Sequence, residues 1–410
     1  MTHSLDRILA QGAMLHDSGR YHEALALYDQ YAQIFQNSEY FWNNRANTLL
    51  ELGLHQQASE SYRHALLLAP GLDVARVALA SCLQSLGEYQ EALVECETVL
   101  AHSPNNAEAH WNRSLLLLLD GHYREGWLEY EWRWKKQRFT SPRREYPQPL
   151  WSGEEIHGKT LLIHAEQGLG DTIQFCRYLP LLVQRGASII FECHTPLTGL
   201  MRTLGNGITP VPFGSPLPRF DLHLPLLSLP LILNTTLATI PASIPYLKPP
   251  SDKTAFWRSI IPCDRQKKIG ICWAGKTYPD PGRSCPPELL NGLTSQTAAG
   301  WYSLQADSAL PAPHGIIDLS SQLLDFSDTA AMLVMLDLIV TIDTSVAHLA
   351  GALGKDTLLM LPFSADWRWL TGRRDSPWYP TMKIFRQPSA GDWPAVIADI
   401  GNHLQSSGIT

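Results

Sequence analysis

The stretch LIVTIDTSVAHLAGALG, residues 338–354, predicts the fold of the second half of the chain. Its first five residues form the aliphatic, β-branched run that is typical of a buried parallel strand. Asp343, Thr344 and Ser345 are residue types that cap helices, and the small side chains that follow continue as a helix ended by Gly354. A second apolar run at 357–361 completes a strand–loop–helix–strand unit.

The loop at 343–345 is the first candidate binding site. It lies between the carboxyl end of a strand and the amino end of a helix, where free N–H groups and the helix dipole favour an anion. The hydroxyl groups of Thr344 and Ser345 can add hydrogen-bond donors, and His348 lies one turn into the helix. A phosphate site and an ordinary helix cap both fit this pattern, and the two alternatives stay open.

The composition narrows the class of protein. The chain has 410 residues, 45% of them hydrophobic, and a net charge of −7, which predicts two or three packed domains. It contains no long basic run and no apolar stretch of about 18 residues, so we expect no nucleic-acid partner and no membrane span. The start lacks the features of a signal peptide, and the seven scattered cysteines include no CxxC pair. These features predict a cytoplasmic protein with reduced thiols.

Residues 1–138 contain four copies of a 34-residue repeat. Four columns of residues recur in phase: glycines at 19, 53, 87 and 121; small residues at 12, 46, 80 and 114; alanines at 24, 58 and 92 with Gly126; and Tyr28, Tyr62, Cys96 and Tyr130. This pattern resembles the tetratricopeptide repeat, which implies an α-solenoid with a concave groove for a protein or peptide. Asn43 and Asn47 share one helix face, and that face lines the groove in the family; simple solvent exposure is the alternative.

The sequence of the remaining chain predicts a linker and two α/β domains. Prolines mark residues 139–150 as the linker, and we place the two domains at 151–262 and 263–410. In the first domain a strand at 160–164 runs into a glycine loop with Gly168 and Gly170, followed by Asp171 and Gln174. Asp171 faces the carboxyl edge of the sheet, where open α/β proteins place their sites, although a helix cap is the ordinary use of such an aspartate. Residues 220–247, rich in Pro and Leu, are expected to form irregular loops along a cleft.

The second domain supplies the candidate cations. A strand beginning at residue 268 ends in a loop with Lys276, and Arg283 and Ser284 follow in the same loop. A guanidinium or ammonium group suits phosphate oxygens, although each residue alone is more often a surface charge. Ser303 and Gln305 lie on the next strand and its exit.

Together these segments resemble glycosyltransferases of the GT-B fold, nearest to the lipopolysaccharide heptosyltransferases. The segments 164–175, 221–230, 328–331, 366–369 and 376–380 further resemble bacterial tetratricopeptide-repeat glycosyltransferase-like proteins. The resemblance implies an α plus α/β architecture: a repeat solenoid followed by two Rossmann-like halves, with the last helix crossing back to the first half.

The resemblance also implies residue roles. Asp343, Thr344, Ser345 and His348 would lie at the diphosphate of a nucleotide-sugar donor, with Arg283 as the neutralising cation and Ser284 beside it. Ser303 and Gln305 would lie near the base or ribose, and Asp171 would be the general base. No metal and no cofactor is implied. Lys276 replaces a smaller polar residue of the relatives, so its place in the donor site is open.

The resulting expectation is a cytoplasmic, metal-independent glycosyltransferase. It would move a sugar from a nucleotide-diphosphate sugar to a protein acceptor that the repeats hold, such as flagellin or another surface protein. Two alternatives remain: a non-catalytic adaptor whose GT-B domain only binds a nucleotide sugar, and a transferase for lipid-linked glycans.

Overall fold

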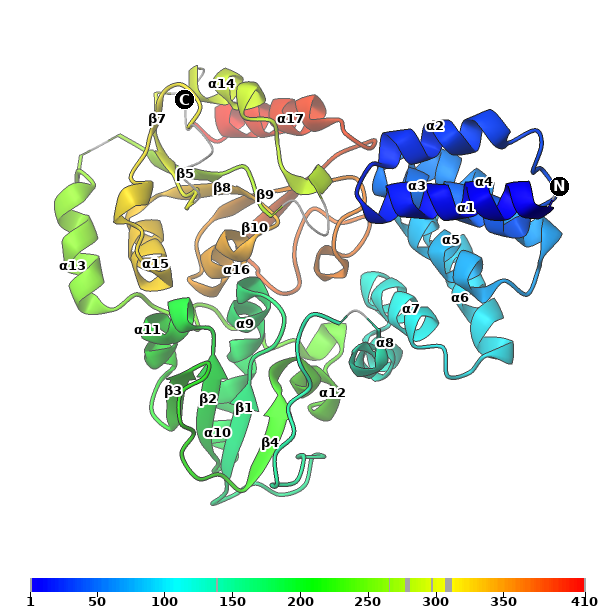
Figure 1. Cartoon of the computed structure of the whole chain (residues 1–410). Coiled ribbons are helices and arrows are strands. Elements are labelled where there is room, and N and C mark those ends of the chain that lie inside the picture. Colours follow the sequence, from blue (N-terminus) through cyan, green and yellow to red (C-terminus); the bar gives the residue numbers. More distant parts are fainter. Residues whose placement is uncertain are drawn as a thin grey trace. The chain divides into compact units, whose positions relative to one another are not determined.

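The computed structural model describes residues 2–137, 139–264, 266–276, 281–295, 298–306 and 312–408. The chain divides into two compact units, residues 1–139 and 140–410 (Figure 1). The first unit is helical, and the second contains two parallel β-sheets.

The first unit consists of four antiparallel helix pairs, one for each predicted repeat. The helices are α1 (Thr2–Asp17), α2 (Tyr21–Tyr31), α3 (Glu39–Glu51), α4 (His55–Leu68), α5 (Asp73–Ser85), α6 (Tyr89–His102), α7 (Ala107–Leu119) and α8 (Tyr123–Tyr130). A short 3₁₀ helix, η1 (Glu131–Lys135), follows α8.

The residue columns of the repeats have direct structural reasons. All four column glycines have φ between +72° and +85°, a backbone conformation that side chains with a Cβ rarely adopt, and each one turns the chain between the helices of its pair. At Gly12, an added Cβ would lie 2.2 Å from the Tyr28 hydroxyl, so only glycine allows α1 and α2 to approach this closely. Ala46 and Tyr62 make the equivalent buried contact in the second repeat.

The first sheet of the second unit has the strand order β3-β2-β1-β4, and all pairs are parallel. Its elements are β1 (Thr160–His164), α9 (Leu169–Phe175), η2 (Cys176–Tyr178), α10 (Leu179–Gln184), β2 (Ser188–Cys193), η3 (Thr195–Leu197), α11 (Thr198–Met201), η4 (Arg202–Leu204), β3 (Ile208–Pro212), β4 (Leu222–Pro225), η5 (Leu226–Ser228), α12 (Leu229–Ile232) and η6 (Leu237–Thr239). The next helix, α13 (Ser251–Ile260), packs against α15 (Phe326–Met335), a helix of the second sheet.

Two segments next to this sheet differ from the predictions. The predicted linker packs on the sheet: Arg144 forms an ion pair with buried Glu192, and Tyr146 covers its apolar face. The segment 220–247 is not entirely irregular, because it supplies the buried edge strand β4. The pattern concealed this strand because all four of its side chains are buried, so no polar–apolar alternation marks it.

The second sheet has the order β10-β9-β8-β5-β6-β7 and is parallel throughout. Its elements are β5 (Lys268–Cys272), η7 (Pro281–Arg283), α14 (Pro287–Ser295), β6 (Gly300–Ser303), β7 (Ile316–Ile317), η8 (Ser320–Gln322), α15 (Phe326–Met335), β8 (Leu338–Ile342), α16 (Ser345–Ala352), β9 (Thr357–Leu361), η9 (Trp367–Trp369), β10 (Met382–Arg386) and α17 (Trp393–Ser406).

The last helix does not cross back to the first sheet, contrary to the expectation. Trp393, Ile400 and Leu404 of α17 are buried in the core of the second sheet, where α17 packs against β10 and α14. The helix has its apolar positions on one face, and burying that face on the nearest sheet satisfies them.

Candidate functional site

Both sheets change direction next to a predicted site loop. In the second sheet the chain builds outward from β5 through β6 and β7, and then returns to place β8 on the other side of β5. In the first sheet β4 returns in the same way to the other side of β1. Ligands of open α/β sheets bind beyond the carboxyl ends of the strands at such a switch point. The glycine loop follows β1, and residues 343–345 follow β8.

The amino end of α16 has the geometry expected of an anion site. Thr344 is the N-cap residue, and its hydroxyl oxygen accepts a hydrogen bond from the Val346 N–H at 3.3 Å. The Ser345 hydroxyl makes no hydrogen bond to any residue that the structure describes, and its side chain is half-buried. Ser345 therefore offers a donor beside the positive end of the helix dipole.

Arg283 lies against this helix end. An added Cβ on Gly275 would lie 3.0 Å from Arg283 Nε and 3.2 Å from the Thr344 methyl group, so both side chains lie close to Gly275. Arg283 Nη2 donates to the Lys276 carbonyl oxygen at 2.9 Å. Its Nε–H is buried and has no hydrogen-bond partner among the described residues. The loop thus holds a guanidinium group with an unused donor next to Thr344.

Two neighbours of Arg283 have different positions. Ser284 Oγ accepts the Gly275 N–H at 3.1 Å, so Ser284 fixes the loop on which Arg283 rests. The Lys276 side chain is exposed, and residues 277–280 lie outside the described part of the chain. Burial lowers the pKa of His194, and the charge of Lys276 adds to this effect. The Lys276 charge therefore acts on His194, which follows β2 of the first sheet.

Ser303 and Gln305 already have internal partners. The Gln305 amide accepts the Ala274 N–H and donates to the Ala274 carbonyl oxygen, both at 3.1 Å. Ser303 Oγ accepts the Gln305 N–H at 3.2 Å, and Ser303 is buried. These bonds align the ends of β5 and β6, and their geometry counts against the predicted contact with a base or ribose.

Helices α9 and α16 join the two sheets directly, and Figure 1 shows them adjacent between the sheets. An added Cβ on Gly170 would lie 2.7 Å from His348 Cδ2, so glycine is required at this close approach. His348 is buried, its Nδ1 lies 2.9 Å from the Tyr379 hydroxyl, and its ring stacks on Trp369. Burial holds the pKa of His348 well below its usual value. His348 is therefore a neutral packing residue of this contact, and its predicted place at the diphosphate stays a prediction.

Asp171 is not the free carboxylate that a general base requires. One of its oxygens accepts the Gly168 N–H at 2.8 Å at the start of α9. The other accepts a hydrogen bond from Arg368 Nη2 at 2.5 Å. Burial raises the pKa of Asp171, and the Arg368 guanidinium and the Gly168 amide oppose this effect. The carboxylate thus turns back onto its own helix, as in the capping alternative, and its role as a base stays a prediction.

Two arginines connect the sheets, and neither was predicted from the sequence to have this role. Arg368 Nε donates to Gln174 Oε1 at 2.5 Å, so this glycine-loop residue also serves the connection. Arg177 is buried and donates to the Trp378 carbonyl oxygen at 2.7 Å and to the Tyr246 hydroxyl at 3.0 Å. A sequence signal existed for both: each arginine lies among aromatic residues in an apolar segment. Its partners, about 200 positions away, could not be inferred from it.

Asp343 lies in the same contact region. Burial and the nearby Asp366 carboxyl raise its pKa to about 7, and the Trp369 indole and the Arg368 and Arg283 guanidinium groups oppose this effect. Its Oδ1 is 4.0 Å from His348 Nε2. Asp343 therefore carries a proton for part of the time at neutral pH, which reduces its repulsion of an anion at Thr344 and Ser345.

The shifted pKa makes a prediction about stability. A carboxyl group whose pKa is higher in the folded state binds protons more tightly in that state, so the free energy of unfolding falls as pH rises from about 4 to about 7. Asparagine cannot titrate. We expect Asp343→Asn to gain stability relative to the wild type above pH 7 and to lose that advantage near pH 4, measured by urea unfolding across this range. Parallel pH profiles of the two proteins would contradict the raised pKa.

The two asparagines of the repeats also have internal partners. Asn47 Oδ1 accepts the Tyr62 hydroxyl at 2.7 Å, and buried Asn43 donates to Asn44 Oδ1 at 3.3 Å. Both bonds lie within the helix pairs of the repeats. A role for these residues in a groove stays a prediction, and Asn47 would offer only its amide N–H groups.

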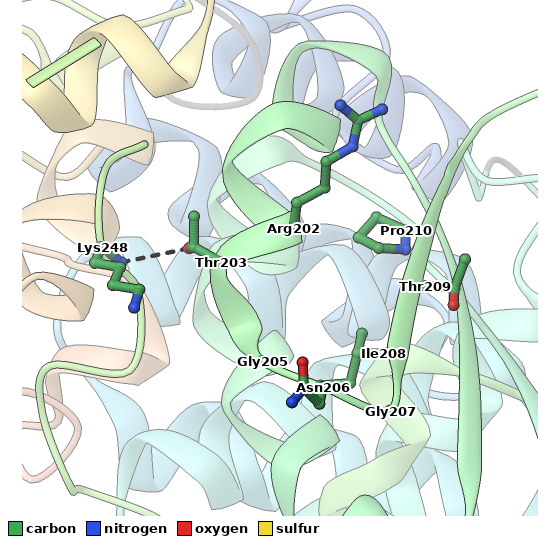
Figure 2. Close-up of a pocket in the computed structure, with 9 residues that line it drawn as sticks. All are labelled: Arg202, Thr203, Gly205, Asn206, Gly207, Ile208, Thr209, Pro210 and Lys248. Atoms are coloured by element: carbon green, nitrogen blue, oxygen red, sulfur yellow. Dashed lines mark hydrogen bonds between the residues drawn. The ribbon is translucent and has the colours of Figure 1, made fainter. Parts of the chain in front are cut away.

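A surface pocket of about 700 Å³ lies away from these residues (Figure 2). It is lined by Gly205, Asn206 and Gly207, which precede β3, and it lies at the sheet end opposite the glycine loop. Arg202 and Lys248 flank it, and Figure 2 shows their charged ends directed apart. No single anion position is shared by the two cations, so the pocket adds nothing to the candidate site.

The described residues contain neither a membrane-spanning helix nor a cluster of metal-ligand side chains. No helix in that part of the chain is both long and apolar enough to cross a membrane. No group of three or more His, Cys, Asp or Glu side chains among the same residues is placed to hold a metal ion.

Comparison with known proteins assigns the repeats. Residues 49–116 match the family model of the tetratricopeptide repeat, which confirms the class predicted for the first unit. Protein FlbA of Caulobacter vibrioides is 27% identical over 403 residues, in an alignment that covers 89% of this chain and 66% of that protein. The chain thus spans about two thirds of the length of this relative.

Two solved structures are also similar to the chain. A crystal structure of MamA is 17% identical, with a TM-score of 0.30, over 31% of this chain and 74% of that one. The second tetratricopeptide domain of human RPAP3, determined with an HSP70 peptide, is 24% identical, with a TM-score of 0.26, over 26% of this chain and 89% of that one. The protein defined by sequence and structure is thus a tetratricopeptide-repeat solenoid followed by a parallel-sheet α/β region.

Proposed function

We propose that the chain is a metal-independent glycosyltransferase whose α/β region has the GT-B arrangement and whose repeats recruit a protein acceptor. The donor is a nucleotide-diphosphate sugar, and its diphosphate binds at the amino end of α16. The observation that carries this proposal is the position of Arg283, whose buried Nε–H has no partner among the described residues and lies beside Gly275 and Thr344. A diphosphate oxygen would supply that partner.

The chemistry of transfer fits these groups. As the glycosidic bond to the diphosphate breaks, negative charge develops on the departing oxygens, and helix N–H groups, Ser345 and Arg283 can stabilise it. The acceptor hydroxyl must lose a proton as it attacks the anomeric carbon, and Asp171 on the opposing helix is the carboxylate we assign to this step. Because cations and amides supply the positive charge, we expect donor binding to persist in the presence of a chelator.

A second candidate function is a non-catalytic adaptor that binds a nucleotide sugar. The ion pair between Asp171 and Arg368 favours this alternative, because a paired carboxylate is a poor base. A thermal-shift panel of nucleoside diphosphates and nucleotide sugars selects the donor for either function, since a ligand of the folded state raises its melting temperature. Transfer of the selected sugar to a protein distinguishes the two, and a panel without any shift contradicts both.

The donor site makes a quantitative prediction. We expect Arg283→Ala to weaken nucleoside-diphosphate binding by about 1–3 kcal/mol, the range for a charged hydrogen bond that is lost. Isothermal titration calorimetry measures the change. Arg374→Ala is the matched control, because that guanidinium is exposed and pairs with Asp399 on the surface. Equal affinities of Arg283→Ala and the wild type would remove Arg283 from the site.

A further inference from the structure

Arg368 is shared by carboxylate and amide groups from both sides of the contact between α9 and α16. Its side chain is 8% exposed and donates to Asp171, to Gln174 and, at 2.9 Å, to Asp366. Asp171 and Gln174 belong to α9, whereas Asp366 precedes Arg368 in η9 and therefore moves with it. The bonds to Asp171 and Gln174 thus help to hold Arg368 to α9 of the first sheet.

The charges around Arg368 disfavour an anion in this arrangement. Asp171, Asp343 and Asp366 surround one guanidinium group, and buried His348 is neutral. The carboxylates neutralise the positive charge of Arg368. A diphosphate with two negative charges would bind next to Asp343, close enough for electrostatic attraction to Arg368. A diphosphate gains most if Arg368 exchanges Asp171 for a phosphate oxygen, because a guanidinium fork binds either group in the same way.

The segment that carries Arg368 is held under backbone strain. Leu370, which follows η9, has φ +50°, a region that non-glycine residues rarely occupy because their Cβ is crowded there. The Leu370 carbonyl oxygen accepts Arg386 Nη2 at 2.7 Å, which helps to hold this conformation. Gln174 Nε2 is also buried without a hydrogen-bond partner in the described part of the chain. Positive φ at Leu370 and the unpaired amide of Gln174 show that this segment is not in its lowest-energy local arrangement.

We propose that Arg368 is a further cation of the donor site, and that its ion pair with Asp171 is a latch which the diphosphate of the donor opens. This inference rests on the proposed function. In the free protein the latch keeps the Asp171 carboxylate paired. When a diphosphate binds, Arg368 turns to it and leaves Asp171 available to the acceptor hydroxyl. The base is thus released only when a donor is present.

A thermodynamic cycle tests the latch without any transfer assay. Calorimetry measures the affinity for ADP, GDP, UDP and CDP in the wild type, Asp171→Asn, Arg368→Gln and the double variant. Removing the Asp171 charge favours any anion, with or without Arg368, so the informative quantity is the difference between the two backgrounds. A latch predicts that Asp171→Asn tightens binding about 5- to 150-fold more when Arg368 is present than when it is absent.

Further variants make the cycle decisive. Arg368→Lys keeps the positive charge but loses the fork, so we expect an affinity between those of the wild type and Arg368→Gln. Arg373→Gln is the control, because its ion pair with Asp375 is on the surface of the same segment. If the affinity change of the double variant equals the product of the two single changes to within about twofold, the latch is overturned and the proposed function still stands. No binding of any nucleotide to the wild type would instead overturn the proposed function.

Discussion

Replacing Asp171 with asparagine is expected to lower sugar transfer by roughly 10²–10⁴-fold, the usual contribution of a positioned base. The amide oxygen of asparagine can still accept the Gly168 N–H, but the ion pair with Arg368 is lost, so we expect some loss of stability without unfolding. Nucleoside-diphosphate binding should not weaken, and the latch predicts that it tightens. Turnover, urea unfolding and calorimetry on the same preparation separate these three effects.

A matched control for this experiment is Asp392→Asn. Asp392 caps α17 by accepting the Ala395 N–H at 3.1 Å, and α17 packs in the core of the second sheet. Both variants should remain folded under assay conditions, as urea unfolding can verify, and only Asp171→Asn should lose turnover. Transfer at the wild-type rate by Asp171→Asn would reduce Asp171 to a cap and an ion-pair partner. The base would then be sought at His164 or Glu166, which are buried before the glycine loop.

Replacing Arg177 with leucine is expected to destabilise the α/β unit by about 3–5 kcal/mol. The substitution removes the Arg177 hydrogen bonds to several buried or half-buried acceptors, and each acceptor that is left unsatisfied costs about 1–3 kcal/mol. The acceptors are the carbonyl oxygens of Gln174, Pro241 and Trp378. The rings of Tyr246, Trp378 and Tyr379 also lose a cation–π partner.

Urea unfolding of the full chain measures this loss. Arg185→Leu is the control, because that arginine is exposed at the end of α10 and should change stability by no more than about 0.5 kcal/mol. A similar small effect for Arg177→Leu would show that the connection between the two sheets contributes little to folding.

Local patterns predicted the elements that carry the site. The strand at 160–164 agrees with β1, and residues 338–354 form β8, the Thr344 cap and α16 as expected. These predictions succeeded because each element has its own period, cap and stop signal within a few residues. The repeat columns succeeded for a similar reason, since one backbone conformation recurs at four glycines.

Long-range contacts were not predictable in the same way. Asp171 was singled out for its position after a glycine loop, and nothing near it in the sequence indicates Arg368, 197 residues later. Gln305 and Asn47 are polar residues at plausible site positions whose groups are used by nearby backbone or side chains. Whether a polar side chain is free or already paired depends on the packed structure, and a hydrophobic pattern carries no information about it.

Hydrogen exchange of the full chain, measured with and without the nucleoside diphosphate that the thermal panel selects, tests the central claim most directly. A bound diphosphate should slow exchange of the backbone amides at the amino end of α16, residues 344–348, and in the loop that holds Gly275 and Arg283. Diphosphate binding at α16 predicts protection there, together with changed exchange around Arg368 as its ion pair with Asp171 opens. Protection confined to residues 202–210 around the surface pocket, or to the repeats, would contradict it.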